Sequence, residues 1–202
     1  MSDGPIDLVC WDFGDTLVHE RFMRICPPGV PEWEEVYDEI AAEPEWEQAW
    51  MLGEANLTDL IPRLAERLPM TNGAIGRHLR TVWQQIEWYP DAREWINRLN
   101  GRVAQTIVTV NPFEFSGIAT ACGLDPLVEI IVTSADIRST SKVDMTEHAR
   151  RLLGMEPGVS TSILIDNRLD NCEEFTEAGG AAIHFTPETF AAEAETALTS
   201  LA

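Results

Sequence analysis

The sequence predicts an α/β protein with a doubly wound parallel sheet and a small all-helical second part. Short apolar runs that stop at turn residues alternate with segments of helical periodicity at the N-terminus and through the second half of the chain. A long stretch between these regions carries helical patterns alone. Strands that alternate with helices of ordinary length favour parallel βαβ units, with helices covering both faces of the sheet.

The first apolar run, residues 6–13, ends abruptly at a Gly-Asp pair, as a buried strand does on entering a tight turn. Further runs occupy residues 103–110, 127–132, 162–165 and, more weakly, 181–185. Asp12, Thr109 and Asp166 each fall at the carboxyl end of one of these strands. Sheets of this kind bind ligands beyond the carboxyl ends of their strands, so we expect the three residues to share a site.

Helical patterns separate the strands. Residues 91–99 and 146–153 place apolar side chains at helical spacing, and residues 172–178 are followed by two glycines that form a natural helix stop. The segment 18–88 is rich in Glu, Trp and Leu and is interpreted as an insertion of helices at about residues 32–41, 45–52, 57–68 and 71–85. The predicted domains are therefore a core of residues 1–17 and 89–202 and a helical insertion of residues 18–88.

Composition limits the classes of partner. With 34 acidic and 14 basic residues the net charge is −20, which disfavours nucleic acid and anionic membrane surfaces. No apolar run approaches the roughly 20 residues that a membrane span needs. The N-terminus shows no secretory pattern, and the four cysteines form no CxxC pair, so we expect reduced thiols and a cytoplasmic location, as a monomer or homodimer.

Three residue types point to a reaction. A carboxylate at a strand end, such as Asp12, can attack phosphorus or carbon and form a covalent intermediate. Lys142 is the only lysine among fourteen basic residues, and its compact ammonium suits the neutralisation of a bound anion. Asp166 and Asp170, four residues apart, offer the hard oxygen ligands that Mg²⁺ prefers.

These residues belong to four motifs that resemble, in order, those of the haloacid dehalogenase superfamily. The motifs are residues 11–17, 107–111, 139–144 and 163–171. The resemblance implies a Rossmann-like core with a helical cap inserted after the first motif. Two details depart from the usual pattern, because Val110 separates Thr109 from Asn111, and Val143 stands where the family commonly has proline.

The resemblance also implies roles. Asp12 would be the nucleophile, with Thr109 and Lys142 holding and neutralising the phosphoryl oxygens. The implied Mg²⁺ ligands are Asp12, the backbone carbonyl of Gly14, Asp166 and Asp170. The candidate substrate-binding residues are Asp15, Thr16, Asn111, Arg21 and Arg24. The expected activity is Mg²⁺-dependent hydrolysis of a small-molecule phosphate ester through an aspartyl phosphate.

Gly14 is the main departure from a phosphatase pattern. Phosphatases of the family usually carry there a second Asp, which protonates the leaving alcohol and then activates water, a contribution of about 10² to 10⁴ in rate. Asp15, His19 or a cap residue could supply the proton instead. Gly14 also leaves open a metal-independent 2-haloacid dehalogenase, and a weakly active or non-catalytic protein that binds a phosphorylated ligand.

Overall fold

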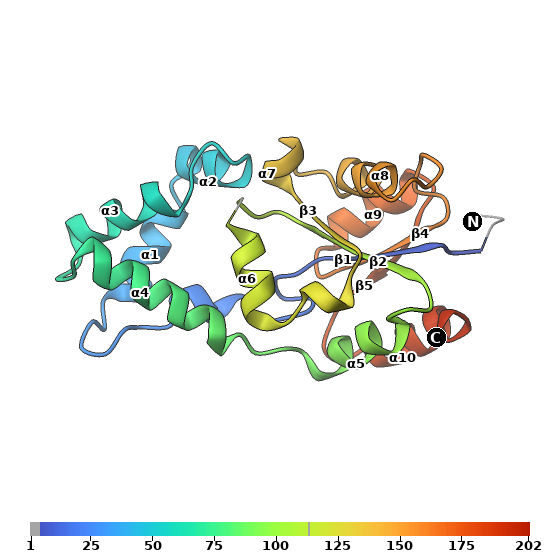
Figure 1. Ribbon diagram of the computed structural model, residues 1–202, viewed down its shortest axis with the longest axis horizontal. Coiled ribbons are helices and arrows are strands. Elements are labelled where there is room, and N and C mark those ends of the chain that lie inside the picture. The colour runs from blue at the N-terminus through green and yellow to red at the C-terminus, as the bar shows by residue number, and fades with distance from the viewer. Residues whose placement is uncertain (1–4, 113) are drawn as a thin grey trace.

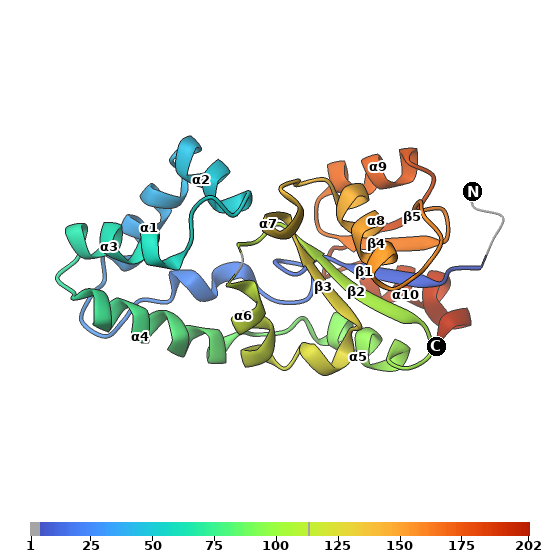
Figure 2. The same ribbon diagram turned by 45° about the horizontal axis from the view of Figure 1, so that its top comes forward.

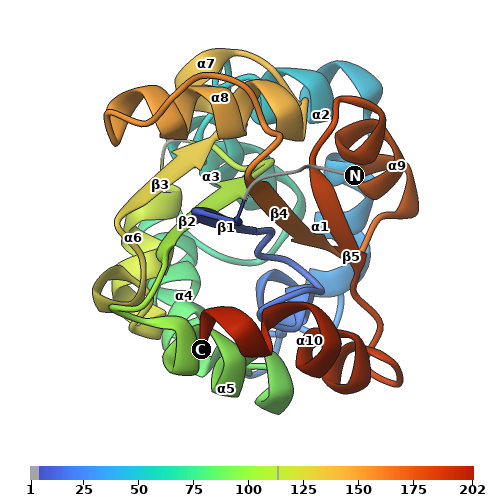
Figure 3. The same cartoon turned by 90° about the vertical axis from the view of Figure 1, so that its right-hand side faces the viewer.

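A parallel sheet forms the centre of the computed structural model, which describes residues 5–112 and 114–202. Residues 1–4, the start of the predicted core, lie outside the described part. Within it the sheet has five strands in the order β3-β2-β1-β4-β5, seen end on in Figure 3. They are β1 Leu8–Trp11, β2 Ala104–Thr109, β3 Ile130–Thr133, β4 Ser162–Asp166 and β5 Ala181–His184. The predicted doubly wound α/β fold is confirmed.

Helices cover both faces of the sheet (Figures 1 and 3). Helices α8 (Lys142–Leu152) and α9 (Leu169–Glu177) lie on one face, and α5 (Pro90–Leu99), α6 (Phe115–Cys122) and α10 (Phe190–Leu198) lie on the other. The buried strand β1 packs against the helices on both faces. Leu8 and Cys10 lie in one apolar cluster, and Val9 and Trp11 lie in the cluster on the opposite face. Alternation along a strand thus explains why β1 is apolar at every position.

The segment between β1 and α5 is helical, as predicted, and extends to the left of the sheet in Figure 1. Its helices are η1 Glu20–Arg24, α1 Trp33–Ala41, α2 Pro44–Met51, α3 Leu57–Arg67, α4 Asn72–Val82 and the 3₁₀ turn η2 Trp83–Gln85. The start of α3 follows from its sequence, since Asn56 and Asp59 form a capping box. Leu60 and Leu64 of α3 are buried in the cluster that also holds Trp11, so the cap and the core share apolar packing.

The two crossings between the sheet and the helical segment run side by side. The His19 amide donates to the Glu87 carbonyl, the Tyr89 amide donates to the Leu17 carbonyl, both at 2.9 Å, and Val18 forms an antiparallel bridge with Trp88. We propose this paired segment as the hinge that divides the core from the cap.

The cap also touches the core away from the hinge. The Leu57 amide at the start of α3 donates to Glu114 Oε1 at 3.0 Å, and the Ser134 hydroxyl of α7 (Ser134–Ile137) donates to the Met51 carbonyl. Figures 1 and 2 show α2 next to α7. The cap therefore contacts the core near the carboxyl end of the sheet as well as at the hinge.

Several predicted boundaries need correction. Residues 125–127 form a 3₁₀ turn, so the third strand occupies 130–133 and not 127–132. Helix α4 ends at Val82, and the predicted helix to residue 85 continues only as 3₁₀. Helix α8 begins at Lys142, four residues before the predicted start, because the Ser141 side chain caps the Asp144 amide. In the described residues no helix is both long and apolar enough to cross a bilayer.

Candidate active site

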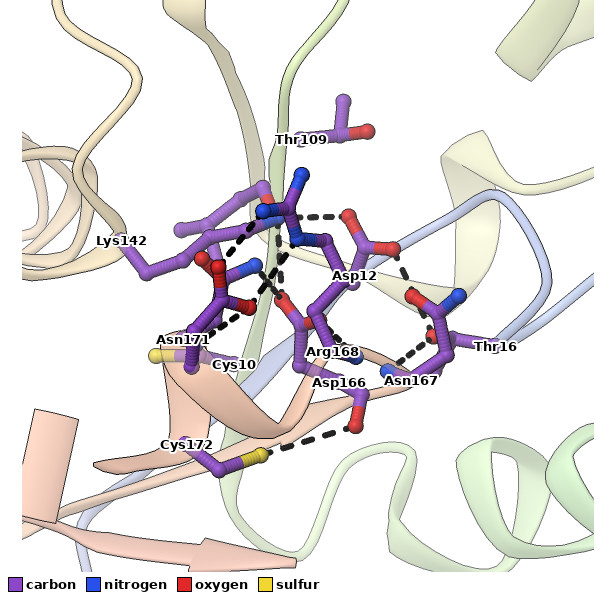
Figure 4. Close-up of polar contacts among 12 residues, drawn as sticks. Cys10, Asp12, Thr16, Thr109, Lys142, Asp166, Asn167, Arg168, Asn171 and Cys172 are labelled. Atoms are coloured by element: carbon purple, nitrogen blue, oxygen red, sulfur yellow. Dashed lines mark hydrogen bonds and ion pairs between the residues drawn. The ribbon is translucent and has the colours of Figure 1, made fainter. Parts of the chain in front are cut away.

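Asp12, Lys142 and Asp166 meet at the carboxyl end of the sheet (Figure 4). Trp11 of β1 is in register with Ile165 of β4, which brings the next residue on each strand side by side. The Lys142 Nζ donates to Asp12 Oδ1 at 2.6 Å and lies 3.2 Å from Asp166 Oδ2. It also donates to the Val108 carbonyl at 2.7 Å, which fixes the ammonium between the strands.

The charges of this cluster do not cancel. Two carboxylates face one ammonium, and the side chains of Lys142 and Asp166 are 2% and 0% exposed. Burial raises the pKa of Asp12, and Asp166 adds to that effect while Lys142 opposes it. Burial alone would lower the pKa of Lys142, but Asp12 and Asp166 outweigh it and raise the pKa, which keeps the side chain an ammonium.

Asp166 is held by the segment that follows it. The Arg168 amide donates to its Oδ1 at 2.8 Å, and Asn171 Nδ2 donates to its Oδ2 at 3.0 Å. The role of Asn171 was not predicted. It lies in the first turn of α9, a position that directs its side chain back toward the end of β4.

Asp170, predicted as a metal ligand, has a different environment. Its side chain is 64% exposed and forms a two-bond ion pair with Arg168, at 2.6 and 3.1 Å. It occupies the first turn of α9, where a carboxylate is favourable next to the helix dipole. Asn171, and not Asp170, is the residue of this turn that contacts Asp166.

Thr16 connects the two strand-end loops. Its hydroxyl lies 3.4 Å from Asp12 Oδ2 and accepts a hydrogen bond from the Asn167 amide at 3.0 Å. Thr16 is fully buried. Its contacts position Asp12 against the loop after β4, whereas the sequence suggested a substrate contact.

Thr109 lies on the opposite side of Asp12 from Asp166, because β2 and β4 flank β1. Asn111 Nδ2 donates to the Thr109 hydroxyl at 2.8 Å, although Val110 separates the two in sequence. Asn111 also lines the large cavity described next. The pair is therefore assembled despite the unusual spacing.

A cavity of about 430 Å³ separates the cap from this site. It reaches Gly14 and Asn111 on the core side and is lined mainly by apolar side chains, among them Trp46, Trp50 and Trp83. Arg24 lines it as well, but its Nε donates to Asp38 at 2.7 Å. Arg21, the other arginine predicted to bind substrate, is exposed and is not among the lining residues.

The candidate proton donors near Gly14 differ in where they lie. The His19 ring packs at a tilt of 41° against Tyr89, with ring centroids 4.0 Å apart, and Asp15 accepts a hydrogen bond from the Glu20 amide at 3.1 Å. Glu20 lines the cavity. Glu20 is exposed, but partial desolvation by the atoms around it raises the pKa of its carboxyl group, and Asp15 and Asp12 raise this pKa further while Arg24 opposes them. Glu20 was missed in the sequence because only the fold brings it to Gly14.

The site fits a hard cation in its donor chemistry. Asp12 and Asp166 supply carboxylate oxygens, and the Gly14 carbonyl accepts no hydrogen bond from the described residues. The excess of one negative charge over the ammonium also favours a cation. No three His, Cys, Asp or Glu side chains in the described chain gather as a metal site, so a cation here would rely on two carboxylates, a carbonyl and water or substrate, a set that suits Mg²⁺.

No family model matches the sequence, and no curated protein matches it either. Solved structures do match. An L-2-haloacid dehalogenase from Xanthobacter autotrophicus, with chloropropionic acid covalently bound, shares 14% identity at a TM-score of 0.63 over 98% of this chain and 84% of that one. A HAD family enzyme from Bacteroides thetaiotaomicron, in complex with magnesium and inorganic phosphate, shares 12% identity at a TM-score of 0.60 over 90% and 95%.

A HAD-superfamily hydrolase of subfamily IA from Geobacter sulfurreducens is also similar, with 16% identity and a TM-score of 0.55 over 89% of this chain and 86% of that one. Structural similarity at identities this low shows the fold alone, and the three proteins share the same fold. The fold that the resemblance of the four motifs implies is therefore confirmed: this chain shares the fold of these dehalogenase and HAD-family structures.

Proposed function

We propose that this protein is a Mg²⁺-dependent phosphohydrolase that acts on a small phosphorylated metabolite through an aspartyl phosphate on Asp12. The observation that carries the proposal is the contact of one buried ammonium, Lys142 Nζ, with both Asp12 at 2.6 Å and Asp166 at 3.2 Å. This arrangement leaves one uncompensated negative charge at the nucleophile, and a bound cation would balance it.

In the proposed reaction Asp12 attacks the phosphorus, and Lys142 offsets the repulsion between the carboxylate and the incoming anion. The Thr109 hydroxyl, oriented by Asn111, donates to a phosphoryl oxygen. Thr16 and the Lys142 contact keep the Asp12 carboxylate in a fixed direction for the attack.

Asp12, the Gly14 carbonyl and Asp166 would hold Mg²⁺, with Asn171 and the Arg168 amide orienting Asp166. The ion would supply neutralisation of the phosphoryl oxygens. The exposed, Arg168-paired position of Asp170 supports a contact through water more than a direct one. The Bacteroides relative, solved with magnesium and inorganic phosphate, lends support to this choice of ligand.

The cavity suggests the shape of the alcohol part of the substrate. Its mostly apolar wall, with Trp46, Trp50 and Trp83, favours an ester whose body is aromatic or aliphatic.

A second candidate function is metal-independent 2-haloacid dehalogenation, in which Asp12 displaces halide from carbon. Gly14 and the similarity to an L-2-haloacid dehalogenase favour it. Against it stands Asp166, a second buried carboxylate that would repel the carboxylate of a haloacid. A third candidate, a protein that only binds a phosphorylated ligand, rests on Gly14 alone.

The test compares wild type with Asp12→Asn in two assays, phosphate release from an aryl phosphate with and without Mg²⁺, and halide release from chloropropionate. Asp91→Asn, an exposed position at the start of α5, is the matched control. We expect phosphate release that needs both Mg²⁺ and Asp12 and is retained in the control. Metal-independent halide release would replace the proposal with the dehalogenase, and silence in both assays would favour the binding protein.

A further inference from the structure

The Glu20 side chain occupies the space into which a side chain on residue 14 would project. A Cβ built on Gly14 would lie 3.4 Å from Glu20 Cδ and 3.5 Å from both its Cγ and its Oε2. The phosphatase pattern expects a carboxylate on residue 14. The fold thus delivers a carboxylate to that space from a position six residues later in the chain.

The backbone fixes Glu20 there. Asp15 adopts a left-handed conformation with φ 50, which turns the chain sharply after Gly14. The Asp15 carboxylate then accepts from the Glu20 amide at 3.1 Å, and the His19 amide is bound to the Glu87 carbonyl in the hinge. Glu20 begins η1, so its backbone is fixed by the contacts of its own amide and of the His19 amide.

The Glu20 carboxylate is also free to react. It forms no hydrogen bond or ion pair with the residues that the structure describes, since the nearby Arg24 is paired with Asp38. It lines the same cavity as Gly14 and Asn111, and its side chain is accessible to solvent. A leaving alcohol and an incoming water can therefore both reach it.

On the basis of the proposed phosphohydrolase activity, we propose that Glu20 is the catalytic acid and base of this site, in place of a residue at position 14. As Asp12 Oδ bonds to phosphorus, the bond from phosphorus to the ester oxygen breaks, and that oxygen keeps the electron pair and takes the proton of Glu20. The Glu20 carboxylate then takes a proton from water, whose oxygen attacks the phosphorus. The phosphorus–Oδ bond breaks, its pair returns to Asp12, and phosphate leaves with Glu20 protonated again.

The experiment compares Glu20→Gln with wild type on two esters under single-turnover conditions with Mg²⁺. Ethyl phosphate has a poor leaving group and needs the proton, whereas dinitrophenyl phosphate does not. We expect phosphorylation of Asp12 to slow by about 10²-fold or more with ethyl phosphate and by less than about tenfold with dinitrophenyl phosphate. In a second experiment with dinitrophenyl phosphate in excess over Glu20→Gln, a burst of phenolate equal to the enzyme should precede slow turnover, because the phosphoenzyme then lacks its base.

Glu35→Gln, an exposed substitution on α1 outside the cavity, is the matched control and should behave as wild type. The double variant Gly14→Asp with Glu20→Ala moves the carboxylate to the side chain of residue 14. It should hydrolyse ethyl phosphate at least tenfold faster than Glu20→Ala alone.

Equal losses on the two esters, or no loss on either, would overturn the assignment, as would a double variant no faster than Glu20→Ala. A wild type that releases no phosphate from either ester would refute the proposed function itself. If the wild type is active and its activity depends on Asp12, the proposed function stands, and the results with the Glu20 variants test only the role of Glu20.

Discussion

Lys142 shows how much one residue can decide in this chain. It is the only lysine, and its ammonium is the cation that separates the buried carboxylates of Asp12 and Asp166. Arginine, which the chain uses everywhere else, has a planar fork that cannot replace a point charge in the same narrow space. The one lysine of the chain therefore lies where a compact charge is needed between two carboxylates.

Removal of that charge should affect both activity and stability. Lys142→Met keeps an unbranched side chain but leaves two buried carboxylates without a cation. We expect phosphate release to fall by about 10²-fold or more and the free energy of unfolding, measured with urea and a chelator, to fall by about 3 kcal/mol. Adding Asp12→Asn should recover part of the stability, and Lys142→Arg should not restore activity. A Lys142→Met variant as stable as wild type would show that the charges are not coupled.

Asn171 is predicted to act on the metal through Asp166. Asn171→Ala removes the amide that donates to Asp166 Oδ2 at 3.0 Å, so the carboxylate is less firmly oriented. We expect the Mg²⁺ concentration for half-maximal activity to rise by about 10- to 100-fold, with activity at saturating Mg²⁺ largely kept. A Mg²⁺ titration measures this, with the exposed Asn97→Ala of α5 as control. An unchanged titration midpoint would remove Asn171 from the metal site.

At the scale of elements, the periodicity of apolar residues predicted those strands and helices whose positions depend on local sequence. The strands that end at Trp11, just before Asp12, at Thr109 and at Asp166 were predicted because a buried parallel strand is a short apolar run with an abrupt end. The start of α8 was missed by four residues, since the buried positions of its first turn are Lys142 and Met145, and a buried lysine interrupts the apolar pattern. The approach of Glu20 to Gly14 depends on a turn and on the hinge with Glu87, contacts that no spacing in the sequence reveals.

One ion pair ties α8 to the start of the sheet. Arg150 of α8 is 2% exposed, and its Nη1 donates to Asp7 Oδ1 at 2.6 Å and to the Ser162 hydroxyl of β4 at 3.0 Å. Burial would raise the pKa of Asp7, but hydrogen bonds from Arg150 and Thr161 outweigh it and lower the pKa below its ordinary value. The folded state therefore prefers the carboxylate more strongly than the unfolded state does.

This preference predicts a pH dependence of stability. With a lowered folded pKa, the contribution of Asp7 is complete above the ordinary aspartate pKa near 4 and is lost as the pH falls below it. Asp7→Asn should cost about 1 kcal/mol at neutral pH, a low value because Asp7 is half-exposed, and the difference from wild type should shrink between about pH 5 and 3. Urea unfolding measures both. In an Arg150→Met background Asp7→Asn should have little further effect, and a constant difference across this pH range would contradict the account.

At the scale of the whole molecule, repulsion between negative charges destabilises the fold, whereas apolar packing between cap and core stabilises it. The chain carries 34 acidic and 14 basic residues, and the acidic cap helices α1 and α2 close onto a site that already has a carboxylate in excess. Self-repulsion of a net charge of −20 destabilises the compact state. Apolar packing that is continuous from Trp11 to Leu64 holds the cap on the core in spite of it.

Screening should relieve this repulsion, so the protein should be more stable in salt. We expect the Tm to rise by about 2 to 4 °C, equivalent to about 1 kcal/mol, between roughly 10 mM and 1 M NaCl, as the Debye length falls from about 30 to 3 Å. Calorimetry in the presence of a chelator measures the rise without a contribution from Mg²⁺. The double variant Glu34→Gln with Glu35→Gln, both exposed on α1, should be more stable at low salt and show a smaller rise. A Tm that falls with salt would mean that the surface ion pairs, such as Arg63 with Glu43, contribute more than the net repulsion costs.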